Sequence, residues 1–157
     1  MNKVLRMPAW ELFIALMLSM IAGSVMPNIG TIIFGIALIG WLYFLGMATN
    51  LLIPSSMRFS NIFFIFRLSF SLIYIVIMSL FFNHDIPNIA IPFHIIATIF
   101  IFSCLWTCAK TIVIAETQKR HGFDKYIGTF FLLWFFPIGI WFVQPRLNRF
   151  ATMEKPT

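Results

Sequence analysis

The stretch that decides the fold is Tyr126-Ile-Gly-Thr-Phe-Phe-Leu-Leu-Trp-Phe-Phe-Pro-Ile-Gly-Ile-Trp-Phe-Val143. It is too apolar for the surface of a soluble protein, and Gln144-Pro145-Arg146 follows it directly. The charged segment 110–125 precedes it, so basic residues flank the block on both sides. As a continuous helix, residues 127–143 would measure about 25 Å, less than a hydrocarbon core of about 30 Å. How this block sits in a bilayer therefore decides the topology of the chain.

Composition places the chain among the integral membrane proteins. Of its 157 residues, 61% are apolar and 10% are charged, whereas a soluble domain carries about a quarter charged residues. The net charge is +6, but Lys and Arg also collect in the cytoplasmic loops of membrane proteins, and here they are divided among several short segments. The composition therefore indicates a lipid bilayer as partner and argues against nucleic-acid binding.

Four apolar stretches precede the block, and each approaches or exceeds the length of a membrane span. Lys3 and Arg6 precede the first of them, a pattern that secretory signals share. Because the apolar chain resumes within four residues of its end, we expect an uncleaved first span. The sequence thus predicts one all-α membrane domain over 1–157, a bundle of four transmembrane helices plus a C-terminal broken or re-entrant apolar helix. The predicted spans are 11–26, 29–53, 62–82 and 89–109.

The distribution of charge predicts that both termini are cytoplasmic. With four spans, the loops around Pro27 and Asp85 lie outside, and neither contains Lys or Arg. All eleven basic residues then fall on the cytoplasmic side or at its edge, as the positive-inside rule expects. A fifth crossing by residues 127–143 would instead carry Arg146 and Arg149 outside. We therefore expect the block to enter the membrane from the cytoplasm and to return to it.

Pro137 and Gly139 are the predicted turn of this re-entrant segment, because proline and glycine both interrupt helices. One alternative is a fifth span, which a thinner membrane permits. Another is a helix lying flat in the interface, which needs a polar face, and Thr129 is the one conventional polar side chain in the block. Since a re-entrant backbone must be covered by protein, we expect the turn to pack against the bundle.

Arg67 lies inside a predicted span, about 7 to 8 Å from its inner end. Arg67, Ser71 and Tyr74 fall on one helical face. A polar face in lipid normally turns toward protein, so we expect Arg67 to pair with Glu11 or Asn50, which lie near the inner ends of their own spans. The alternative is that its long side chain extends to the headgroup layer.

A seam of small residues runs along the fourth span and its continuation, and such a seam is typical of helix packing. Cys104 and Cys108 belong to it. They are four residues apart on one helix, which is a poor arrangement for a disulfide, and no further ligands accompany them for a metal. We expect this face to be buried against another helix. The seam consists of Ala97, Cys104, Cys108, Thr111 and Ala115.

Three titratable residues near the end of the fourth span have the chemistry for acid and base catalysis, namely Glu116, His121 and Asp124. A solvated loop contains the same residue types, and we expect Glu116 to pair with Arg120 one turn along the helix. Gly122 is the expected end of that helix. The sequence therefore predicts no catalytic residue.

Metal and cofactor motifs are also missing from the sequence. His84, Asp85 and His94 lie at the predicted outer surface, but they lack the spacing of metal ligands. We therefore expect no metal and no cofactor.

The last third of the chain resembles the C-terminal signature of uncharacterised small multi-pass bacterial membrane proteins. The resemblance rests on Ala109-Lys-Thr through Glu116, on Asp124-Lys-Tyr-Ile-Gly128, and on the WFFPIGIW and QPR sequences within 131–148. The first three spans are similar to such proteins only in hydropathy. The resemblance implies a bacterial inner (cytoplasmic) membrane and carries over no catalytic residue.

Three classes of function are compatible with these features. A non-enzymatic accessory, scaffold or immunity-type component, acting through a membrane protein partner or self-association, is favoured by the lack of a reactive constellation and by the dense aromatic residues over 130–142. A transporter or oligomeric channel subunit is suggested by the Arg67 face and by the interrupted C-terminal block. A membrane enzyme acting on lipid at the cytoplasmic face would need Glu116, His121 and Asp124 to converge.

Overall fold

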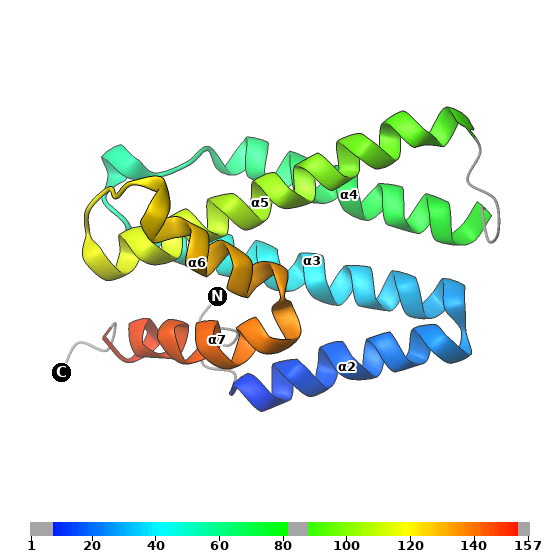
Figure 1. Cartoon of the computed structure of the whole chain (residues 1–157), viewed down its shortest axis with the longest axis horizontal. Helices are drawn as coiled ribbons and strands as arrows, with labels where there is room; N and C mark the ends of the chain where they lie inside the picture. The colour runs from blue at the N-terminus through cyan, green and yellow to red at the C-terminus, as the bar shows by residue number, and fades with distance from the viewer. Residues whose placement is uncertain (1–7, 82–87, 154–157) are drawn as a thin grey trace.

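The computed structural model describes residues 8–81 and 88–153, and the regular structure of this part of the chain is entirely helical (Figure 1). The all-α prediction is confirmed. Six α-helices are found in the described residues, and two connections contain a 3₁₀ turn, η1 (Ser55–Met57) and η2 (Asn88–Ala90). The α-helices are α2 (Ala9–Val25), α3 (Pro27–Leu52), α4 (Asn61–Phe81), α5 (Ile91–Thr117), α6 (Phe123–Trp134) and α7 (Phe136–Met153).

Helices α2 to α5 run alternately in opposite directions, and α6 and α7 form a shorter hairpin against them (Figure 1). Helix α3 packs against α2, α4 and α5, whereas α6 packs against α5 and α7 packs against α2. The junction of α6 and α7 lies near the middle of the long axis of the bundle (Figure 1). The hairpin therefore covers only part of the length of the long helices and returns to the end from which it came.

Three helical segments in the described part of the chain are long and apolar enough to cross a membrane. They are Pro27–Leu52 with 26 residues, Asn61–Phe81 with 21 residues and Asn88–Thr117 with 30 residues. At 1.5 Å per residue, all three exceed a hydrocarbon core of about 30 Å. The expected span 11–26 corresponds to α2, whose 17 residues measure about 25 Å. Length alone therefore supports three crossings and leaves α2 slightly short.

The end of α5 differs from the prediction. We expected the helix to end at Gly122, but it ends at Thr117, and Gln118 adopts the left-handed conformation with φ 55°. The backbone N–H of Gln118 donates to the carbonyl oxygen of Ile114 at 2.7 Å, and its side-chain amide donates to the carbonyl oxygen of Leu52 at 3.3 Å. These hydrogen bonds hold a residue with a side chain where glycine is more common.

The predicted break in the C-terminal block is present, but it lies two residues before Pro137. Helices α6 and α7 meet at Phe135, and Pro137 stands in the first turn of α7, where a helix tolerates proline best. Gly139 belongs to the same turn, and its backbone N–H donates to the carbonyl oxygen of Phe135 at 2.8 Å. A Cβ atom at Gly139 would lie 1.5 Å from the carbonyl oxygen of Leu132. Proline therefore occupies the first turn of α7, and glycine permits the two helices to meet.

The core lies where α3, α4 and α5 meet. Gly46 on α3 permits this close approach, because a Cβ atom there would lie 2.4 Å from the ring of Phe64 and 3.3 Å from the Cys108 sulfur. The α6–α7 hairpin contributes to the same core, and its fully buried side chains include Leu133 and Ile140. The hairpin is thus part of the packed bundle.

Basic side chains of the described residues gather at one end of the bundle, which we call the basic end. It is formed by the connection 53–60, the last turns of α5, the connection 118–122, the start of α6 and the second half of α7 (Figure 1). The opposite end, formed by the α2–α3 turn and by η2, has no Lys or Arg among the described residues. The side chains of the basic end are Arg58, Lys110, Lys119, Arg120, Lys125, Arg146 and Arg149.

Candidate functional site

A ladder of polar contacts joins α4 to α5. Ser71 is fully buried, and its hydroxyl lies 3.3 Å from the carbonyl oxygen of Ala97 on α5. The hydroxyl of Tyr74 lies 3.0 Å from Nδ1 of His94, also on α5. The polar face of α4 therefore lies against the neighbouring helix, as its spacing indicated. We call these contacts, together with that of Arg67, the α4–α5 ladder.

Arg67 forms the third contact of the ladder, but with a different partner from the ones expected. Its Nη1 donates to the hydroxyl of Ser103 on α5, and its Nε donates to the carbonyl oxygen of Phe63 at 3.1 Å. The predicted pairing with Glu11 or Asn50 is wrong. Glu11 is exposed on α2, and α2 packs against α3 and α7 rather than against α4.

Asn50 connects the end of α3 to the start of α4. Its side-chain amide donates to Oδ1 of Asn61 at 2.8 Å, and its own Oδ1 accepts the backbone N–H of Phe59 at 3.1 Å. Asn50 is 3% exposed, so these bonds satisfy a polar group that would otherwise be costly to bury. Its role is to fix the connection between two long helices.

The seam of small residues on α5 packs against α3. Cys104 and Cys108 are free and fully buried, and the sulfur of Cys108 lies 3.7 Å from the carbonyl oxygen of Leu42. The hydroxyl of Thr111 lies 2.7 Å from that of Thr49 on α3. Ala97 and Ala115, at the two ends of the seam, are also buried. These residues hold helices together and present no exposed thiol.

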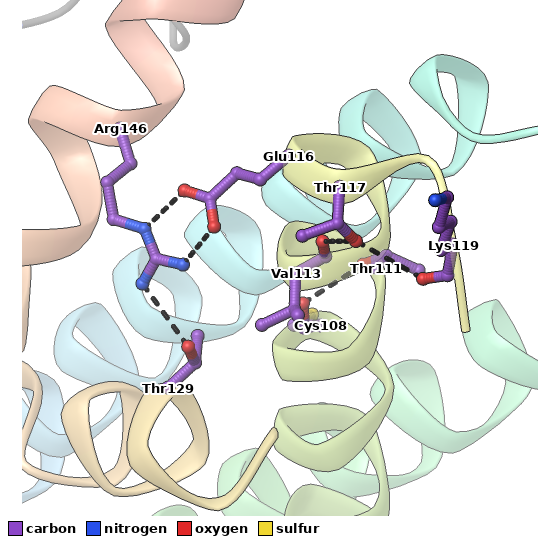
Figure 2. A network of polar contacts seen from close by, with 8 residues as sticks. All are labelled: Cys108, Thr111, Val113, Glu116, Thr117, Lys119, Thr129 and Arg146. Atoms are coloured by element: carbon purple, nitrogen blue, oxygen red, sulfur yellow. Dashed lines mark hydrogen bonds and ion pairs between the residues drawn. The ribbon is translucent and has the colours of Figure 1, made fainter. Parts of the chain in front are cut away.

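An ion pair and a hydrogen bond join α5, α6 and α7. Arg146 on α7 faces the carboxylate of Glu116 on α5 with two nitrogens, and its Nε lies 2.5 Å from Oε1 (Figure 2). Its third nitrogen, Nη1, lies 3.2 Å from the hydroxyl of Thr129 on α6. We call these three residues the clasp. Such a bidentate pair is stronger than a single charged hydrogen bond, and it fixes the orientation of the guanidinium relative to the carboxylate as well as their distance.

The clasp replaces the expected pair between Glu116 and Arg120. Arg120 lies beyond the end of α5, and its Nη2 donates to the carbonyl oxygen of Ser56 at 3.1 Å. Because the helix ends at Thr117, Arg120 is no longer one turn above Glu116 on a helical surface. The carboxylate is instead bound by a residue 30 positions later in the chain.

The three candidate acid and base residues have separate surroundings. Both carboxylate oxygens of Glu116 are bound by Arg146. The backbone N–H of His121 donates to the hydroxyl of Tyr126 at 2.7 Å. Asp124 stands in the first turn of α6, where the helix dipole stabilises an acidic side chain. In the described residues no hydrogen bond joins any two of the three.

Of the three candidate metal ligands, His94 alone lies in the described part of the chain. His94 contacts Tyr74 within the ladder, and His84 and Asp85 lie outside the described residues. Among the residues that the structure describes, no group of three His, Cys, Asp or Glu side chains is placed to hold a metal ion.

Two apolar grooves are found in the described bundle, and the first of them adjoins the ladder at Tyr74. One, of about 420 Å³, opens between the ends of α4 and α5 farthest from the basic end, and Tyr74 is its one residue with a polar side-chain group. The other, of about 290 Å³, lies between α3, α5 and the tip of the hairpin, where Trp134 and Phe136 form part of its wall. Both are lined by side chains that suit hydrocarbon.

Sequence reasoning missed Ser103, Thr129 and Arg146 as partners. The signal for Arg146 was present, because an acidic residue at the edge of an apolar segment needs a cation nearby, and the QPR sequence supplies one. Ser103 gave no signal, since serine is common in membrane helices. A comparison of the chain with known protein families, curated proteins and solved structures gave no match.

Proposed function

We propose that this chain is a small non-enzymatic protein of the bacterial inner membrane that acts through protein contacts in the bilayer, as an accessory, scaffold or immunity-type component. In this proposal α2 to α5 cross the membrane, and the α6–α7 hairpin enters from the cytoplasm and returns. Both termini are then cytoplasmic. The resemblance of the last third of the chain to small bacterial multi-pass proteins supports the choice of membrane.

The position of charge supports this topology. The basic end then faces the cytoplasm, as the positive-inside rule expects, and the opposite end carries no Lys or Arg among the described residues. Helix α6 has 12 residues and measures about 18 Å, too short to cross a hydrocarbon core of about 30 Å. The short α2 crosses with a modest local thinning of the bilayer.

The observation that carries the proposal is the exposure of the break between α6 and α7. Phe135, at the break, is 58% exposed. The backbone N–H and carbonyl of Phe135 are already hydrogen-bonded within the hairpin, to Phe131 and Gly139, so the group left open here is the aromatic side chain, and a second protein surface would cover it. Aromatic side chains are also enriched in protein interfaces. The other exposed aromatic side chains of the hairpin are Phe131, Trp134, Trp141 and Phe142.

The transporter or channel alternative is favoured by one observation, the α4–α5 ladder, because polar side chains inside a membrane often line a path. In the described residues, however, each of the three α4 side chains bonds to a group on α5. The ladder therefore supports helix packing more directly than conduction. The lipid-enzyme alternative loses its support because the carboxylate of Glu116 is bound by Arg146.

A site-specific photo-crosslinking experiment tests the proposal. The full chain is expressed in its native membrane with benzoylphenylalanine in place of Phe135, or in place of Phe66 on α4 as a matched control. The two side chains are 58% and 57% exposed. We expect a stoichiometric adduct with one membrane protein, or with a second copy of the chain, from position 135 and not from position 66. Lipid adducts alone at both positions would contradict the proposal.

A further inference from the structure

We infer that the part of the α4–α5 interface nearest the basic end binds the phosphate group of an anionic lipid, through Arg67 and Lys110. This inference rests on the proposed topology, which places the basic end in the cytoplasmic headgroup layer. It concerns a different surface from the hairpin break and a different kind of partner.

The first argument is the incomplete pairing of Arg67. A guanidinium group has five N–H donors and always carries a charge. Two nitrogens of Arg67 donate to neutral oxygens, the hydroxyl of Ser103 and the carbonyl of Phe63. Within the described residues no acceptor is found for its Nη2 and no carboxylate pairs with Arg67, whereas Arg146 does pair with Glu116. An anion from outside the described bundle would therefore balance the charge of Arg67.

The second argument is the direction of the side chain. Arg67 is half-buried, and its bond to Phe63 directs the guanidinium one turn back toward the start of α4. Of the two ends of α4, this start is the one nearer the basic end (Figure 1). Long basic side chains near the ends of membrane helices reach the headgroup layer in this way. The side chain thus bonds to α5 and at the same time approaches the level of lipid phosphates.

The third argument is the position of Lys110. It follows Ser103 by seven residues on α5, so the two share a helical face, and Lys110 lies about 10.5 Å nearer the basic end. Lys110 is exposed, and no ion pair is found for it within the described residues. Between them Trp106 packs its ring against Phe123 at 5.1 Å between ring centroids. Tryptophan is typical of the interface between hydrocarbon and headgroups.

These groups suit a phosphodiester at the edge of the hydrocarbon. Guanidinium groups match the oxygens of a phosphate with paired hydrogen bonds, and an ammonium group adds a second positive charge. Anionic lipids, whose phosphate is not balanced by a cationic headgroup, give the cytoplasmic leaflet a negative surface potential that attracts nearby Lys and Arg. A soluble anion would have to leave water to reach Arg67, whereas the phosphate of a lipid already lies in the headgroup layer, at the edge of the hydrocarbon.

The test is lipid titration of the detergent-solubilised full chain, followed by native mass spectrometry. The probes are dioleoyl phosphatidylglycerol, dioleoyl phosphatidylcholine and inorganic phosphate. We expect tighter binding of phosphatidylglycerol than of phosphatidylcholine, and no adduct with inorganic phosphate. Arg67→Gln and Lys110→Gln should each weaken phosphatidylglycerol binding about fivefold. Lys119→Gln, which removes an exposed charge from the connection after α5, should leave it unchanged.

Four results would overturn the inference. The first is equal affinity for the two lipids, and the second is an unchanged affinity in Lys110→Gln, a variant of an exposed residue that should fold normally. The third is an equal loss in Lys119→Gln, which would mean diffuse attraction by the whole basic end. Binding of inorganic phosphate in place of the lipid would assign the site to a soluble anion instead. Crosslinking at Phe135 is read out separately, so the two proposals can fail independently.

Discussion

Replacing Gly139 with alanine is expected to disrupt the α6–α7 hairpin and to lose more stability than alanine at Gly35 or Gly128. The new Cβ atom would lie 1.5 Å from the carbonyl oxygen and 2.4 Å from the carbonyl carbon of Leu132. Both are backbone atoms, so no change of rotamer relieves the overlap, and α6 and α7 must separate. We expect the free energy of unfolding to fall by on the order of 3 kcal/mol. The loss should be detected as a lower midpoint temperature of heat-induced aggregation in detergent.

Gly128→Ala is the matched control for this prediction. Gly128 lies on α6 in the same hairpin, and a Cβ atom there would meet no atom within 4 Å. Alanine also favours the helix more than glycine by about 1 kcal/mol. The control should therefore match or slightly exceed the native chain in stability. Equal midpoints for Gly139→Ala and the native chain would show that the two helices do not meet as described.

Reversing one charge of the clasp is expected to destabilise the hairpin, and reversing both is expected to restore it. In Glu116→Arg or Arg146→Glu two like charges face each other across α5 and α7, and each variant should lose stability. The native pair is partly exposed, with 25% and 31% of the two side chains accessible, so we expect its coupling to be about 1 kcal/mol. In the double swap Thr129 turns its hydroxyl to donate to the new carboxylate.

A double-mutant cycle over the four forms measures this coupling. Arg120→Gln provides the control, because Arg120 donates to a backbone carbonyl on an exposed surface and its loss should change stability by about 0.5 kcal/mol or less. Additive effects of the two charge reversals would mean that Glu116 and Arg146 do not interact, and the hairpin would lose its main polar attachment to α5.

Local patterns in the sequence predicted the helices and their facing sides. Apolar length located the helices that begin near Pro27, Asn61 and Ile91. Helical spacing placed Ser71 and Tyr74 on one face, and that face lies on α5. These features depend on residues within two or three turns of one another, which is the range over which periodicity carries information.

Contacts between distant segments were predicted less well. The partner of Arg67 was misassigned because facing residues on separate helices depend on crossing angles that periodicity does not contain. Glu116 was paired with the nearest base, Arg120, because the early end of α5 at Thr117 was not foreseen. At that end a hydrogen bond joins Gln118 to Leu52, a residue 66 positions away.

The break in the hairpin illustrates the same limit at short range. The sequence correctly marked the region by its proline and glycine, but both residues were assigned to the turn itself. Proline is accepted in the first turn of a helix, so the chain bends before Pro137, at Phe135. The role of Gly139 became clear from its contact with Leu132 on the opposite helix.

The central claim, that the hairpin returns to the side from which it enters, is tested most directly by labelling Thr152→Cys in intact cells. The background carries Cys104→Ala and Cys108→Ala, and the reagent is a membrane-impermeant maleimide. Ile89→Cys, at an exposed position in η2, serves as the outside control, and Ser56→Cys in η1 serves as the inside control. We expect position 152 to behave like position 56, with labelling only after the membrane is permeabilised. Prompt labelling of position 152 from outside, as at position 89, would mean a fifth crossing and would contradict the re-entrant hairpin.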